Sequence, residues 1–334
     1  MHFITIANRI DILRRSETVL KIELSLPKLL FGNNFNELKY KDFKNLTQKL
    51  VNVLKEMGIE TTTAVISAAP ISAVHYSKNI PLTDGSIPYH FINKIKEANI
   101  KLTLDVNQTD YRNDGHSYKW HCNSYEVVFY DKIRDLEKAR ASDKRCLEKD
   151  SAIQLNLFES LNILRQAPNF AKASSGKQGD RGRLEFLRME VRLNKRSKIK
   201  QLFKKLKIKS DLTFKSIFKP AISKKILLHY LDELESKMIP LVDYKVHDKV
   251  LVSELIAANF PPKKIMLIFG FKKILEIYNT RELHTLFNVK NKRSWQRLIA
   301  EIKKSNLSVN QGSLEVIREC IVLFKPIELT KYIN

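Results

Sequence analysis

The segment from Leu184 to Leu193, LEFLRMEVRL, places the strongest constraint on what this chain can fold into. Its residues alternate with the period of two that is typical of a β-strand. The apolar set is Leu187, Met189, Val191 and Leu193, and the charged set is Arg188, Glu190 and Arg192. We therefore expect a strand with one face toward a core and three charges on the opposite face.

A second alternating segment runs from Asn123 to Glu137, NSYEVVFYDKIRDLE. One side carries Tyr125, Val127 and Phe129, and the other carries Glu126, Val128, Tyr130 and Lys132. The pattern predicts a strand that brings Tyr130 and Lys132 to one face, followed by a charged helix. A phenol beside an ammonium can attack a phosphate, but a tyrosine at the rim of a sheet is also an ordinary structural feature.

Other segments complete an α+β pattern. Alternation or β-branched residues predict strands at residues 18–26, 61–76 and 100–108. Helical spacing predicts helices at residues 43–57, 91–98, 142–166 and 199–206, and residues 171–182 are expected to be a flexible basic loop. Beyond residue 210 the strand pattern fades, and helices are predicted at 226–238, 250–259, 263–278 and 294–304.

We therefore predict an α+β fold with a mixed or antiparallel sheet, followed by a helical C-terminal region. The expected division places the α+β domain at residues 1–209 and the helical region, with a DNA-binding or accessory role, at residues 210–334.

Charge indicates the class of partner. The chain has 59 Lys and Arg against 36 Asp and Glu, a net charge of +23. From Arg192 to Lys209 there are nine basic residues and no acid. This excess favours a polyanion, nucleic acid before an anionic membrane. The basic residues expected to contact DNA are Arg188, Arg192, Lys195, Arg196, Lys198, Lys200, Lys204 and Lys205.

Several classes of protein are disfavoured. No apolar run approaches the roughly 20 residues of a membrane span, and the first residues lack a secretory pattern. Cys122, Cys146 and Cys320 are too scattered for a zinc site or a disulfide framework, so a soluble protein of a reducing compartment is expected. The G-x-x-x-x-G-K-[ST] phosphate loop is absent, which argues against ATP or GTP hydrolysis.

Four polar residues on predicted strands are candidates for one site: His75, Asp105, Tyr130 and Glu190. If their strands are neighbours in one sheet, the polar faces form a single patch. Glu190 between two arginines is either a salt-bridged structural residue or a ligand for a hard cation. His75 and Asp105 have equally ordinary alternatives, a histidine satisfied by the backbone and an exposed acid.

In this order the residues resemble the replication initiators of filamentous phages, the gene II nicking-joining proteins, and their plasmid relatives. The matching stretches are VVFYDKIRDLEKA, then Arg188 to Leu193 with the basic helix after it, and upstream LKIELSLPKLLFGNNFNEL. The resemblance covers roughly residues 19–206 and implies a nicking domain like the Rep core of the HUH endonucleases.

The resemblance implies a rolling-circle replication initiator, a metal-dependent endonuclease that forms a covalent 5′-phosphotyrosine link at the origin. Tyr130 would be the nucleophile and Lys132 its companion. Mg²⁺ or Mn²⁺ would be held by Glu190 with His75 or Asp105. Origin DNA of a phage or plasmid, with host helicase and polymerase, would be the partners in the cytoplasm of a bacterial host.

Two other classes remain open from the residues. A non-catalytic protein that binds an origin or operator through the helical region explains the charge equally well. An RNA-binding accessory protein would use the aromatic and basic stretch 111–120 for base stacking.

Overall fold

The fold is described from a computed structural model for residues 3–10, 16–82, 86–97, 116–136, 185–237, 248–278, 283, 286, 292–304 and 312–328. Three predicted features lie outside these residues: the strand at 100–108 with Asp105, the helix at 142–166 and the loop at 171–182.

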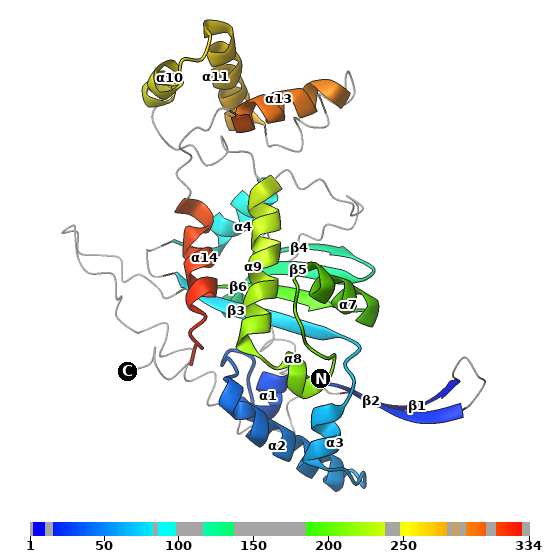
Figure 1. The fold of residues 1–334 in the computed structure, drawn as a ribbon. Helices are drawn as coiled ribbons and strands as arrows, with labels where there is room; N and C mark the ends of the chain where they lie inside the picture. Colours follow the sequence, from blue (N-terminus) through cyan, green and yellow to red (C-terminus); the bar gives the residue numbers. More distant parts are fainter. Residues whose placement is uncertain are drawn as a thin grey trace, which may run out of the picture.

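The centre of the structure is a four-stranded antiparallel sheet (Figure 1). Its strands are β3 (Val74–Leu82), β6 (Glu185–Leu193), β5 (Tyr125–Asp131) and β4 (Ser117–Cys122), in the spatial order β3-β6-β5-β4. The predictions of strands at β5 and β6 and of an α+β fold with an antiparallel sheet are confirmed. Strand β6 lies between β3 and β5, so its charged side chains have neighbours from both of these strands.

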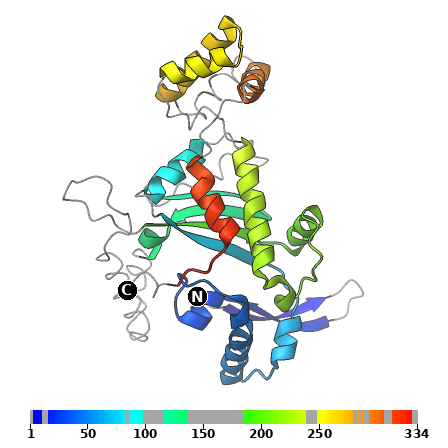
Figure 2. The ribbon, with the colours of Figure 1, turned by 60° about the vertical axis from the view of Figure 1, so that its left-hand side comes forward.

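Three helices cover one face of this sheet: α4 (Pro88–Glu97), α9 (Pro220–Lys237) and α14 (Gly312–Leu323). Helices α9 and α14 run across the same side of the sheet (Figures 1 and 2). The apolar residues of β5 and β6 form one core with all three helices. Helices from beyond the predicted division at residues 209 and 210 thus share a core with the sheet, because the apolar side of each alternating strand must be covered.

The N-terminal helices belong to a smaller part of the structure with a core of its own. Strands β1 (Phe3–Ile10) and β2 (Ser16–Glu23) form an antiparallel hairpin. Helices α1 (Leu26–Phe31), α2 (Phe43–Glu56), α3 (Thr63–Ala68) and α8 (Phe214–Ile217) follow, with a 3₁₀ turn η1 (Tyr40–Asp42) before α2. Apolar residues of the four helices share a second core. Gly58, which has φ 77°, follows the end of α2, where a left-handed residue favours glycine.

Two predicted strands need correction. Residues 63–68, predicted as part of a strand, form helix α3, because Thr62 caps it by accepting a hydrogen bond from the Val65 N–H at 3.3 Å. The true strand β3 begins at Val74 and continues through Pro81, which an edge strand tolerates. Strand β2 ends at Glu23 rather than residue 26, because Pro27 lies in the first turn of α1.

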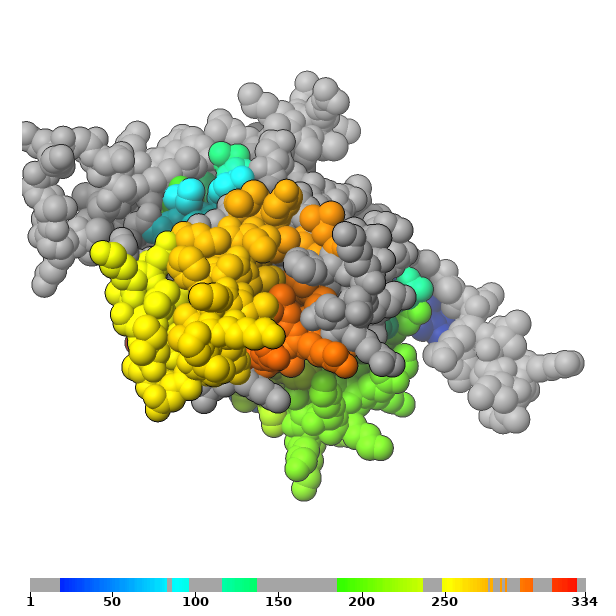
Figure 3. Space-filling model, turned by 90° about the horizontal axis from the view of Figure 1, so that it is seen from above, coloured from blue at the N-terminus to red at the C-terminus, as the bar shows by residue number. Residues whose placement is uncertain are grey.

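The basic helix predicted at 199–206 is α7 (Arg196–Lys205), and its residues Ile199, Leu202 and Phe203 are buried. Three of the predicted C-terminal helices are α10 (Asp248–Ala257), α11 (Pro262–Ile277) and α13 (Lys292–Lys304). They share a core of their own, in which Trp295 packs on Phe271 at 5.8 Å between ring centroids. Their surface is yellow and orange in Figure 3. Within the described ranges, none of the helices combines the length and apolarity needed to cross a membrane.

The packing of α14 on the sheet can be tested with two adjacent residues. Ile321 is fully buried in the sheet core and Val322 is 45% exposed. We expect Ile321→Ala to lower the free energy of unfolding by about 2–5 kcal/mol, because it leaves a cavity. Val322→Ala should change it by less than about 0.5 kcal/mol. Urea unfolding of both variants provides the measurement, and equal effects would contradict the packing.

Candidate active site on the polar face of the sheet

Strand pairing gathers the polar side chains of three strands on the face opposite α9 and α14. Residues directly opposite each other in antiparallel strands have side chains on the same face. The aligned rows are His75, Arg192 and Glu126, then Ser77, Glu190 and Val128, then Asn79, Arg188 and Tyr130. Tyr130 and Glu190 therefore share a face, as the period of two predicts.

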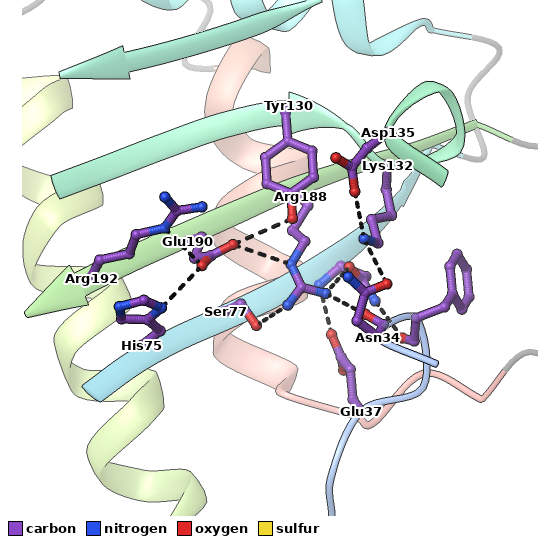
Figure 4. Close-up of polar contacts among 12 residues, drawn as sticks. Asn34, Glu37, His75, Ser77, Tyr130, Lys132, Asp135, Arg188, Glu190 and Arg192 are labelled. Carbon is purple, nitrogen blue, oxygen red and sulfur yellow. Dashed lines mark hydrogen bonds and ion pairs between the residues drawn. The ribbon is translucent and has the colours of Figure 1, made fainter. Parts of the chain in front are cut away.

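Tyr130 and Glu190 are in direct contact. The Tyr130 hydroxyl donates a hydrogen bond to Glu190 Oε2 at 3.3 Å (Figure 4). The Lys132 ammonium lies 5.5 Å from the centroid of the Tyr130 ring. Burial raises the pKa of the Tyr130 hydroxyl above its usual range, so the phenol is protonated at neutral pH. Any role as a nucleophile therefore requires a group that accepts its proton.

Glu190 is held between two guanidinium groups. Arg192 Nε donates to Glu190 Oε1 at 2.9 Å, and Arg188 Nε lies 3.7 Å from Oε2. Burial by itself raises the pKa of this carboxyl, but the charges of Arg188 and Arg192 outweigh it and bring the pKa below the usual range. The carboxylate that meets the Tyr130 hydroxyl is therefore ionised at neutral pH.

Arg188 is directed into the protein rather than toward solvent. It is only 9% exposed. Its terminal nitrogens donate to Asn34 O at 2.9 Å, to Asn79 Oδ1 at 3.1 Å and to Ser77 Oγ at 2.7 Å. These bonds engage the guanidinium within the fold, so it positions Glu190 and the loop after α1. Arg192, whose side chain is 32% exposed, is the arginine of the pair with access to solvent.

Lys132, predicted to share a strand face with Tyr130, instead lies just after β5 and is completely buried at the start of a helical turn over residues 132–136. Asp131 ends β5 and caps this turn, since its Oδ1 accepts from the Arg134 N–H at 3.0 Å. The Lys132 ammonium donates to Asn34 Oδ1 at 3.1 Å and to Asp135 Oδ2 at 2.9 Å. Burial and then the charge of Arg188 lower the pKa of Lys132 to about 8.

Sequence reasoning missed four polar partners of this site: Asn34, Ser77, Asn79 and Asp135. Asp135 has a local signal, because a carboxylate three residues after Lys132 lies on the same side of a helical turn. Asn34 and Arg188 are 154 residues apart, and no spacing in the sequence relates them.

The described residues supply two of the predicted metal ligands. His75 Nδ1 lies 3.7 Å from Glu190 Oε1. Asp105 lies outside the described residues. Among the residues described there is no group of three His, Cys, Asp or Glu side chains that could hold a metal. Because Glu190 is already neutralised by two arginines, these residues by themselves do not fit a divalent cation, and Mg²⁺ or Mn²⁺ stays a prediction.

The predicted DNA-contacting residues lie mostly on α7 and the turn before it. Those that are exposed are Lys195, Arg196, Lys200, Lys204 and Lys205. Lys198 is half-buried, and its ammonium lies 4.2 Å from the centroid of the Tyr125 ring. Helix α7 therefore turns its apolar side to the core and its lysines to solvent.

Comparisons of the chain with protein-family models, with curated proteins and with solved structures find no match.

The role of Glu190 in the fold can be measured through pH. Glu190→Gln leaves two arginines without their shared carboxylate, so we expect about 3–5 kcal/mol less stability at pH 7. The lowered pKa means that the carboxylate stabilises fully above the ordinary pKa of glutamate and less as pH falls through the folded value. The difference between wild type and Glu190→Gln should therefore shrink in acid. Urea unfolding at several pH values tests this, and a difference independent of pH would contradict it.

Proposed function

We propose that this chain is a DNA nicking-joining protein of the rolling-circle initiator type, with Tyr130 as nucleophile. The observation that carries the proposal is the hydrogen bond from the Tyr130 hydroxyl to the ionised Glu190 carboxylate. A buried phenol needs a proton acceptor within hydrogen-bond reach before it can attack, and the Glu190 carboxylate lies within that reach. The strongly basic composition and the resemblance in the order of segments support DNA as the substrate.

The proposed reaction is a transesterification. The Tyr130 oxygen forms a bond to phosphorus while its proton passes to Glu190 Oε2, and the bond from phosphorus to the 3′ oxygen breaks. The departing 3′ oxygen takes a proton and becomes a free 3′-hydroxyl. A 5′-phosphotyrosine link remains, which the same 3′-hydroxyl can reverse. Since the number of phosphate ester bonds is conserved, joining needs no nucleotide hydrolysis.

Positive charge around Tyr130 would stabilise the negative charge that develops on phosphate. Lys132 lies under the phenol ring, and a pKa of about 8 leaves it mostly protonated at neutral pH. Arg192 is exposed enough to contact a phosphate oxygen. The buried Arg188 holds Glu190 in place from the inner side of the network. Fixed charges of this kind are effective because they need no rearrangement during the reaction.

Helix α7 supplies a binding surface for the DNA backbone. Arg192 ends the charged set of β6, and Lys195 and Arg196 follow within four residues. Because Ile199, Leu202 and Phe203 of α7 belong to the core shared with α9, DNA held on the lysines of α7 would have to pass the end of β6 to reach the candidate site on the opposite face of the sheet. The origin sequence, and host helicase and polymerase as partners, belong to the same proposal.

The nucleophile can be tested with two tyrosines of one strand. Tyr130 faces the polar side of β5, and Tyr125 faces the core on the other side. We expect wild type and Tyr125→Phe to nick supercoiled DNA that carries the phage or plasmid origin. Both should also form an SDS-resistant adduct between protein and DNA. Tyr130→Phe should do neither, because it lacks the attacking oxygen. Gel electrophoresis with Mg²⁺ or Mn²⁺ present reads both products.

Equal nicking by wild type and Tyr130→Phe would contradict the nucleophile. Binding to the origin without nicking by any of the three proteins would favour the alternative, a non-catalytic origin-binding or operator-binding protein.

The α7 surface can be tested by salt dependence. Each lysine that contacts a phosphate contributes about one unit to the slope of log affinity against log salt. We expect Lys200→Ala with Lys204→Ala to lower that slope by about two. The matched control is Lys49→Ala with Lys55→Ala, which removes two exposed lysines from α2 and should leave the slope unchanged. Fluorescence anisotropy with labelled DNA provides the measurement; equal slopes for the two double variants would exclude α7 from the interface.

A further inference from the structure

Three segments that are far apart in the sequence meet at the half-buried carboxylate of Glu37, beside the candidate site. Glu37 Oε1 accepts from the Asn79 N–H of β3 at 2.6 Å. Glu37 Oε2 accepts from the Ile327 N–H at 3.1 Å and from the Lys78 ammonium. The Glu37 N–H in turn donates to Ile327 O at 3.0 Å. One side chain thus joins the loop after α1, strand β3 and the chain after α14.

The segment at residues 324–328, which we call the C-terminal segment, is also held by a buried charge, Lys78. Lys78 is 1% exposed and donates to Lys325 O at 2.7 Å. Its ammonium also lies 5.6 Å from the centroid of the Phe324 ring. An ammonium removed from water needs such partners, so Lys78 and the C-terminal segment depend on each other. A salt bridge between Lys39 and Glu328 adds a further tie.

The loop at residues 33–37 connects the contacts of Glu37 to the candidate site. Phe35 is completely buried against Phe186, with 4.8 Å between ring centroids, and its carbonyl accepts from Asn79 Nδ2 at 2.7 Å. Asn34 therefore lies between two fixed neighbours, Phe35 and Asn33, whose Oδ1 accepts from the Phe35 N–H at 3.0 Å. From this position Asn34 accepts hydrogen bonds from two cationic residues of the site, Arg188 and Lys132 (Figure 4).

We propose that the C-terminal segment is part of the active site's support: through Glu37 it holds Asn34 in place against Lys132 and Arg188. Glu37 and Asn34 are then positioning residues, which act through Lys132 and Arg188 rather than on the DNA. This inference rests on the proposed function for its effect on nicking. Its effect on the state of Lys132 follows from the contacts alone.

Loss of the C-terminal segment removes the partners of Glu37 and Lys78 and loosens the loop. Water then reaches the Lys132 ammonium, whose low pKa is caused first by burial. The titration midpoint of Lys132 should rise toward the ordinary lysine value of about 10.4. A misplaced ammonium and a misplaced Glu190 should also slow nicking, by about a hundredfold for a displacement near 1 Å.

The experiment compares two shortened chains. One ends at Glu328 and keeps every contact described above, and the other ends at Phe324 and loses residues 325–328 with the rest. Three properties are measured for each: nicking, DNA binding and the midpoint of Lys132. The midpoint comes from an NMR titration of the lysine side chains, with the Lys132 signal assigned from Lys132→Arg. We expect the chain ending at Glu328 to match the full chain.

For the chain ending at Phe324 we expect nicking to fall about a hundredfold, the midpoint of Lys132 to rise and DNA binding on α7 to persist. An unchanged midpoint in this chain overturns the proposal, whatever its nicking activity. If the full chain does not nick at all, the proposed function fails, and the two midpoints still decide whether the C-terminal segment positions Lys132.

A second variant serves if the chain ending at Phe324 does not fold. Asn34→Ala removes one acceptor of the Lys132 ammonium and keeps the backbone carbonyl that Arg188 uses. Because the loop stays in place in this variant, Lys132 remains buried and only loses a hydrogen bond that favours its charged form, so its midpoint should fall below that of wild type. Asn45→Ala, at an exposed position of α2, is the matched control. Equal midpoints in the two variants overturn the role of Asn34.

Discussion

Burial of Glu190 between two arginines is the interaction on which the rest of the polar face depends. A carboxylate removed from water is tolerable only when opposite charges and hydrogen bonds replace its hydration. Arg188 and Arg192 supply the charges from the same strand, and Tyr130 supplies a hydroxyl from the neighbouring strand. Each of these groups then needs partners of its own, so the network extends to β3 and to the loop after α1.

The network has two layers that differ in their access to solvent. The outer layer contains His75 and Arg192, whose side chains are 51% and 32% exposed. The inner layer contains Arg188 and Lys132, which are buried and bonded to Asn34. This division suits a site in which the outer groups meet a phosphate and the inner groups keep the reacting side chains in one geometry, as fixed charges require.

Much of the fold follows from periodicity. The alternation in β5 and β6 predicts both the strands and the face on which each side chain lies, and helical spacing predicts α2, α7 and the helices α9, α10, α11 and α13. The prediction at residues 63–68 is wrong because β-branched residues suggest a strand there, whereas the cap at Thr62 and a partner core support a helix. Strand β4 and helix α14 were not predicted, although both contribute to the main core.

For the site, the sequence by itself determined that Tyr130 lies on the polar face of β5 and that Arg188, Glu190 and Arg192 share a face of β6, because side-chain direction in a strand depends only on local parity. Only the tertiary structure decided that Tyr130 meets Glu190, that Arg188 is turned inward, and that Glu37, Asn34 and Ile327 lie beside them. Those contacts depend on strand order and on loops that bring together segments distant in the sequence. A local sequence pattern does not determine either of them.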